Sequence, residues 1–161
     1  MKTVIVAAFV GFFALPVFAQ STPVELGPYA ISEDAPVDVS ADSLEISSET
    51  NSASFIGNVL VIQGDIRISA GRVSLFYDPE AGDVVRLEAD GSVVFATPSE
   101  AAEAEAALYN VAERMISLTG GVVLTQGPAT LSAERLVIDL ASGNARLEGR
   151  VRTVFTLGQG E

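Results

Sequence analysis

The sequence predicts an all-β domain built from stacked antiparallel strands in two half-repeats. Apolar and polar residues alternate along much of the chain, as in Ile66-Arg67-Ile68-Ser69, and this period of two is typical of strands with one buried face. Glycine, asparagine, aspartate and proline recur between the alternating segments, where they favour tight turns. Short strands at this spacing indicate a sandwich, a roll or an open barrel.

The chain repeats itself at an offset of 63 residues. Residues 55–64 match residues 118–127, and residues 68–73 match residues 131–136. A shorter Gly-x-Val motif begins at Gly57, Gly91, Gly120 and Gly149, so each half is expected to contain two hairpin-like rungs. Repeated rungs bury a shared core by stacking on their neighbours.

One segment contradicts this pattern, because residues 99–108 are rich in alanine and glutamate, which are strong helix formers. The same offset of 63, however, aligns Tyr109 with Ile46 and places the second part of the segment on an alternating strand. Tertiary context often overrides propensity. We therefore expect a loop or a short turn of helix up to about Ala102, followed by a strand.

The amino terminus has the pattern of a secretory signal peptide. Lys2 precedes an apolar run that ends near Ala19, and this run is shorter than the roughly 20 residues that span a bilayer. We expect a signal peptide at residues 1–19, a flexible leader at 20–36, one β-domain at 37–157 and a tail at 158–161. An uncleaved anchor is the alternative, and the lack of cysteine excludes a lipoprotein.

Composition excludes several classes of function. The chain has no cysteine, histidine or tryptophan, which removes disulfides, thiol chemistry and the usual general base near neutral pH. After the signal peptide, eight arginines face 21 acidic residues, a balance unsuited to nucleic acid. Phosphate-binding and calcium-loop motifs are absent as well. We expect no enzymatic activity, no cofactor, no metal and no nucleic-acid partner.

Several motifs together resemble a known family. They are Ala-Asp-Ser-Leu at 41–44, Phe-Ile-Gly-Asn-Val at 55–59, Gln63-Gly64, Ser-Ala-Gly-Arg-Val at 69–73 and their second copy at 118–136. This set resembles the periplasmic lipopolysaccharide transport proteins of the LptA type, with their OstA-like domain, over residues 37–155. The resemblance implies a twisted, open β-jellyroll shaped like a V, with an apolar groove. Gly71 departs from the pattern, since the second repeat and the family favour an acidic residue there.

The family resemblance also implies a function and a location. Such proteins bind lipopolysaccharide through its lipid A acyl chains and join end to end in the periplasm. They form a bridge from an LptC-like inner-membrane partner to an LptD-like outer-membrane partner, and so serve outer-membrane assembly. The resemblance therefore implies lipopolysaccharide, both of these partners and head-to-tail self-association for this chain.

Strand alternation selects the apolar residues that would line the groove. Burial of each acyl methylene on such a surface contributes about 0.8 kcal/mol. The alternative is that these residues fill a closed core, sealed by Phe55, Phe76, Phe95 and Phe155. The predicted lipid-binding residues are Val59, Val61, Ile66, Ile68, Val73, Leu75, Val93, Phe95, Val122, Leu124, Leu131, Leu136, Ile138, Leu147 and Val151.

The first and last strands are expected to expose edges to which a further strand can add. These two strands lie near residues 37–46 and 150–157, and the tails of the chain could instead cover their edges.

Five arginines that alternate with apolar residues could contact lipid phosphates or could simply mark a solvated face. Two rival functions remain: an assembly module with the same fold that carries no lipid, and the LptC-like partner itself. The five arginines are Arg67, Arg72, Arg135, Arg150 and Arg152.

Overall fold

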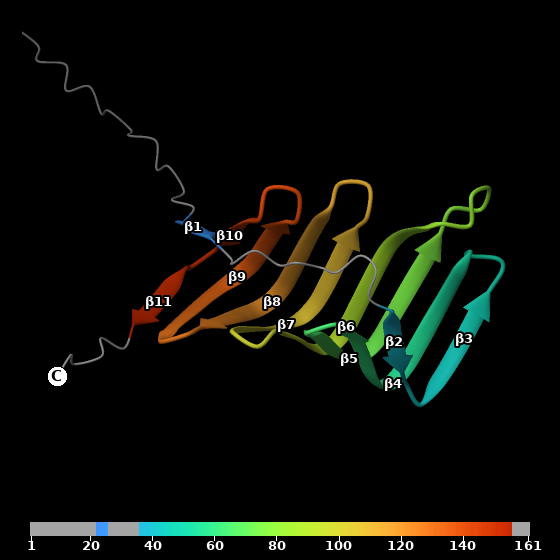
Figure 1. Ribbon diagram of the computed structural model, residues 1–161, viewed down its shortest axis with the longest axis horizontal. Coiled ribbons are helices and arrows are strands. Elements are labelled where there is room, and N and C mark those ends of the chain that lie inside the picture. The colour runs from blue at the N-terminus through green and yellow to red at the C-terminus, as the bar shows by residue number, and fades with distance from the viewer. Residues whose placement is uncertain (1–21, 26–35, 156–161) are drawn as a thin grey trace, which may run out of the picture.

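A computed structural model describes residues 22–25 and 36–155 of the chain. The predicted signal peptide, most of the predicted leader and the predicted tail lie outside the described residues. The described part forms one 11-stranded sheet in which the paired strands are antiparallel (Figure 1). The strands are β1 (Thr22–Glu25), β2 (Val37–Ser40), β3 (Ser43–Ser47), β4 (Ser52–Gln63), β5 (Ile66–Tyr77), β6 (Val84–Ala96), β7 (Glu100–Asn110), β8 (Met115–Gln126), β9 (Ala129–Asp139), β10 (Asn144–Glu148) and β11 (Arg152–Phe155).

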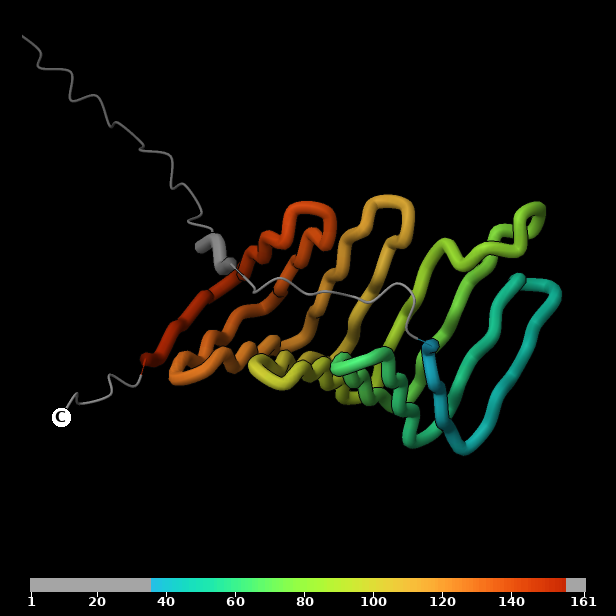
Figure 2. The backbone as a smooth tube through the Cα atoms, in the orientation of Figure 1, coloured from blue at the N-terminus to red at the C-terminus, as the bar shows by residue number. Residues whose placement is uncertain are grey.

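The strands follow one another across the sheet nearly in chain order. The order is β1-β10-β9-β8-β7-β6-β5-β4-β2, with β3 also paired to β4 and β11 also paired to β9. Figures 1 and 2 show these strands side by side along the long axis of the molecule, with β3 and β11 towards opposite ends. This architecture confirms the predicted open, antiparallel all-β fold. None of the described residues forms a helix, so this part of the chain has no helical segment that could cross a membrane.

The two half-repeats are visible in the strand boundaries. At the offset of 63 residues, β4 coincides with β8, and β5 with β9. The short strands β2 and β3 of the first half correspond together to the single strand β7 of the second half. The prediction of a loop or turn of helix up to Ala102 is wrong, because β7 begins at Glu100. Pairing with β6 on one side and β8 on the other overrides the helix propensity of its alanines and glutamates.

A further difference from expectation lies within the predicted flexible leader. Residues 22–25 form β1, which pairs with β10 from Thr22 opposite Leu147 to Glu25 opposite Asn144. The outer side of β10 is therefore covered by a segment from the other end of the domain sequence. The outermost strands of the sheet are β2 and β3 at one end and β1 and β11 at the other.

Each long strand pair bends at a bulge with an unusual backbone. Pairs of consecutive residues adopt positive φ at Gly57 (+81°) and Asn58 (+46°), and again at 91–92, 120–121 and 149–150. The strand register shifts at the first three of these pairs, where two residues lie opposite one on the neighbouring strand. We call this line of four residue pairs the crease. It divides the sheet into a first arm, which includes β3 and β10, and a second arm, which includes β2 and β11.

The residues opposite the crease explain why glycine begins each pair. An ideal Cβ atom on Gly120 would lie 2.5 Å from the Cβ of Glu105, and comparable clashes would occur between Gly57 and Asp42. Gly149 meets Glu134 in the same way. At the remaining position Gly91 faces Gly71 instead, and a Cβ on Gly71 would lie 3.3 Å from the Gly91 Cα. The unexpected glycine at position 71 is thus part of a close backbone approach.

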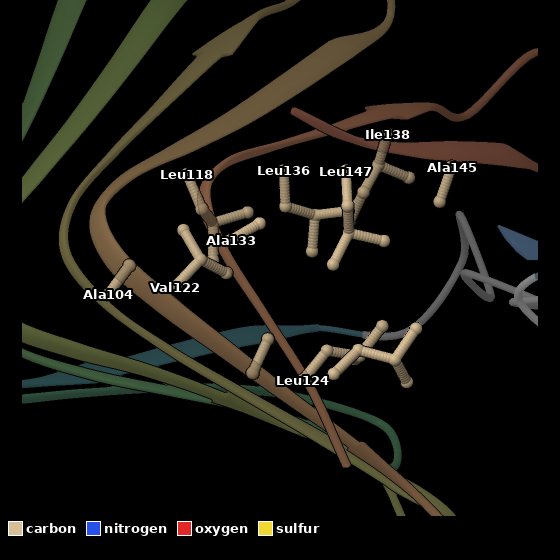
Figure 3. Packing of buried hydrophobic residues seen from close by; sticks show 11 residues of the cluster. Ala104, Leu118, Val122, Leu124, Ala133, Leu136, Ile138, Ala145 and Leu147 are labelled. Carbon is tan, nitrogen blue, oxygen red and sulfur yellow. The ribbon is translucent and has the colours of Figure 1, made fainter. Parts of the chain in front are cut away.

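The apolar residues of both arms face one interior between them. One buried cluster lies in the first half of the chain and includes Val59, Val73 and Val93. A larger cluster in the second half includes Leu124, Leu136 and Leu147. Figure 3 shows Leu136 and Leu147 on one arm pointing towards the same space as Leu124 on the other. Burial between the arms is therefore what holds the folded sheet together.

Substitution at the crease should separate steric from backbone effects. We expect Gly120→Ala to lower the free energy of unfolding by about 3 kcal/mol, because it adds a clash with Glu105 to the unfavourable left-handed backbone. Gly121→Ala is the matched control: its φ is +68°, but nothing lies within 4 Å of the added Cβ. It should lose only about 1 kcal/mol. Urea denaturation followed by circular dichroism measures both, and equal losses would contradict a steric role for position 120.

Candidate functional site: the apolar pocket

The structure places the predicted groove residues on the interior face of the two arms. All of them except Ile66 and Leu75 belong to, or pack against, the two buried clusters. Ile66 and Leu75 lie on the same face by strand alternation, since Ile68 and Val73 are inside. Alternation thus indicated the interior face correctly on both sides of the crease.

Part of this interior is hollow. A cavity of about 130 Å³ lies between the arms where the two half-repeats meet, and we call it the apolar pocket. Apart from the hydroxyl of Tyr109, its lining side chains carry no polar atom. They are Val61, Ile68, Val73, Leu87, Ala89, Val93, Phe95, Ala107, Leu108, Tyr109, Ile116, Leu118 and Ile138.

The hollow arises from two alanines at the centre of a row of larger side chains. Across the first arm, Val73 is opposite Ala89, Ala89 is opposite Ala107, and Ala107 is opposite Leu118. Between β5 and β8 the row therefore has no side chain larger than a methyl group. In the second half of the chain the corresponding row is filled by Leu118, Leu136 and Leu147, which are all buried.

Sequence reasoning missed about half of the pocket lining. Leu118 and Ile116 continue the alternation of Val122 and Leu124 backwards across the Gly120-Gly121 bulge, so this signal was present. Ala107 and Tyr109 lie in the segment whose composition obscured the strand. Alanine also gives no indication of a cavity, because its effect depends on the residues opposite it.

The four phenylalanines do not seal the interior as a group. Phe55 and Phe95 pack against the buried clusters, but Phe76 lies on the outer face, where the guanidinium of Arg86 stacks over its ring at 4.1 Å. Phe155 is 67% exposed at the free edge of β11. The closed core proposed as the alternative would require all four rings inside, and two of them are not.

The charged groups lie mainly on the outer face and in the turns. Arg150 pairs with Glu134 at 2.6 Å, and Arg135 donates to the Ser117 hydroxyl at 2.9 Å. In the described part of the chain, no three or more carboxylates are grouped so that they could hold a metal ion. Arg135 and Arg150 therefore lie on the solvated face, and the lining of the pocket carries no charge.

Two turns at the rim of the first arm each contain an aspartate whose carboxylate accepts hydrogen bonds from the turn. The backbone N–H groups of Ala81 and Glu80 donate to Asp78, and this lowers the pKa of its carboxyl. At Asp139 the hydroxyl of Ser142 and the backbone N–H groups of Ala141 and Ser142 lower the pKa in the same way. Both groups stabilise hairpin turns and lie outside the pocket lining.

A larger side chain at Ala107 tests whether the small alanines create the apolar pocket. We expect Ala107→Leu to raise the free energy of unfolding by about 0.5–2 kcal/mol, because the added carbons occupy the cavity. The variant should also lose binding of an apolar fluorescent dye. Ala106→Leu is the matched control, since Ala106 precedes Ala107 on the same strand and faces the outer side. Thermal unfolding and dye titration measure both effects, and a destabilised Ala107→Leu that still binds dye would contradict the assignment.

Comparison with known proteins agrees with this architecture. The sequence matches a family model described as LptA/(LptD N-terminal domain) LPS transport protein over residues 38–144. An uncharacterized protein of Rhizobium meliloti (strain 1021) is 30% identical, and the match covers 83% of this chain and 78% of that protein. LptH of Pseudomonas aeruginosa, the LptA-homologous periplasmic component of the lipopolysaccharide transport device, has the same fold, with a TM-score of 0.67 at 19% identity over 79% of this chain and 99% of LptH. The chain therefore belongs to the LptA/(LptD N-terminal domain) family of lipopolysaccharide transport proteins.

Proposed function

We propose that this protein binds lipopolysaccharide in the periplasm and carries it between the inner and outer membranes. The observation that supports this function is the apolar pocket between the two arms. A lining without charge suits acyl chains, which need apolar contact and no directed hydrogen bonds. Such contact can be reproduced in the next binding site along a transport path, so the cargo can be passed on.

The size of the apolar pocket allows an estimate of its affinity for an acyl chain. A cavity of about 150 Å³ lined by leucine, isoleucine and phenylalanine is known to bind benzene, so this pocket of about 130 Å³ accommodates a short piece of one acyl chain. Burial of ten methylenes along the interior contributes about 8 kcal/mol, the scale of a micromolar dissociation constant. Ordering the chain reduces that value. The proposed affinity is therefore moderate, as transfer to a partner requires.

The ends of the sheet support the proposed bridge. Ile46 and Leu44 are exposed on β3, at 76% and 51%, and Val37 is exposed on the other edge strand, β2. Phe155 and Val154 are exposed on β11 at the other end. Apolar side chains on unpaired edge strands favour addition of another strand. Because the two edges differ, end-to-end addition would be heterologous and would extend the sheet. We propose LptC-like and LptD-like proteins, and further copies of this chain, as the partners at these edges.

Lipid contact can be located by photo-crosslinking. A photoreactive amino acid at Val61, Leu87 or Ile116 lines the apolar pocket and should form adducts with purified lipopolysaccharide. The same probe at Arg67 or Glu103, which are exposed on the outer face, should form none. Mass spectrometry of the adducts decides the question. Folded variants that give no adduct at any position would rule out transport and leave an assembly module with the same fold.

Association through the edges can be tested with two charged variants. We expect Ile46→Asp and Phe155→Asp each to stay monomeric at concentrations at which the parent protein forms longer species, because a charge on an edge strand opposes strand addition. Mixed in equal amounts, the two variants should form dimers and nothing longer, since each retains one intact edge. Analytical ultracentrifugation measures the outcome. Val85→Asp, at an exposed site away from both ends, serves as the control.

A further inference from the structure

The interior face is not apolar along its whole depth. At the hairpin tips of the second arm, the row beyond Phe95 and Ala102 contains Gln63, Glu100 and Gln126. Ile66 and Ala129, which lie opposite Gln63 and Gln126, are apolar members of the same row. At the rim of the second arm, polar side chains therefore lie one row beyond the apolar Phe95 and Ala102, where the head of a bound amphiphile would meet them.

Glu100 is the unusual member of this polar rim. Its side chain alternates with Ala102 and Ala104 on the inner face, and the residue is only 7% exposed. Its Oε1 accepts a hydrogen bond of 2.6 Å from the Gln126 Nε2. Its Oε2 is buried, and none of the described residues donates to it. No ion pair among those residues includes Glu100.

Hydrogen bonds to Thr97 hold the backbone of Glu100 in place. The Glu100 N–H donates to the Thr97 hydroxyl at 3.2 Å, and the Glu100 carbonyl accepts from the Thr97 N–H at 2.9 Å. Buried carboxylate oxygens without a partner are rare, because removal from water is unfavourable unless a donor replaces it. A buried acceptor to which no residue in the described ranges donates is thus suited to a ligand that brings its own donor.

We propose that the Glu100 Oε2 accepts a hydrogen bond from a hydroxyl or amide N–H at the head of an amphiphile whose alkyl chain enters the apolar pocket. Phe95 lines that pocket and lies opposite Ala102, two residues from Glu100 on the same face. The acceptor and the pocket are therefore about 7 Å apart along the strand. This inference rests on the proposed function, to which it adds selection for the head group.

The carboxylate also discriminates between head groups. A donor head group satisfies the buried oxygen, whereas a head group with acceptors only leaves it unpaired beside other oxygens. Binding should therefore favour sugar-like or amide heads over heads without a donor, at equal chain length. The preference is a property of this rim and not of the apolar pocket.

The test uses two soluble probes with the same dodecyl chain. Dodecyl maltoside carries hydroxyl donors, whereas dodecylphosphocholine carries none. Below their micellar concentrations, we expect the parent protein to bind the maltoside at least tenfold more tightly by isothermal titration calorimetry. Glu100→Leu should remove this preference while changing binding of dodecylphosphocholine less than twofold. Glu103→Gln, an exposed site on the same strand, should leave both affinities unchanged.

The outcomes separate this inference from the proposed function. If the parent protein binds both probes equally, or if folded Glu100→Leu retains the preference, the head-group role of Glu100 is overturned and the apolar pocket stands. If the parent protein binds neither probe, the proposed function fails together with the inference. Glu100→Gln, which keeps the shape and removes the charge, provides a second variant, and it should reduce the preference without abolishing alkyl binding.

Discussion

The structure depends on the alignment of its bulges along one crease. A long antiparallel sheet can fold onto itself only if every strand bends at the same level. Here β4, β6 and β8, and the junction of β10 with β11, each bend at two consecutive residues with positive φ. A shift of one residue in any strand would turn its apolar side chains to the solvent. The interior, the apolar pocket and the two free ends all follow from this alignment.

The strand architecture could be predicted from sequence because its signals are local. Alternation identifies the inner face of each strand, and the Gly-x-Val motifs coincide with the bulges of the crease. The half-repeat gives the strand boundaries of the second half from those of the first. Even Gly71, which breaks the repeat, has a physical reason in its approach to Gly91.

The strand β7 and the polar rim could not be predicted in the same way. Helix propensity differs by a fraction of a kcal/mol per residue, and pairing on both sides of β7 outweighs it. Ala89 and Ala107 create a hollow only because they face each other across neighbouring strands. Glu100 looks like any other acidic residue in an acidic chain until its burial is known. These features depend on cross-strand neighbours, which a single sequence does not reveal.

The correspondence of β2 and β3 with β7 has a consequence for the length of such proteins. In the second half, β7 occupies the place that β2 and β3 occupy in the first, and it is paired there with the preceding half-repeat. The second half-repeat therefore pairs with the first through β7, and the whole chain exposes the equivalent edge, on β2 and β3, at its end. The fold is modular in units of a half-repeat, so duplication within one gene and association between separate chains are two ways to build the same longer sheet.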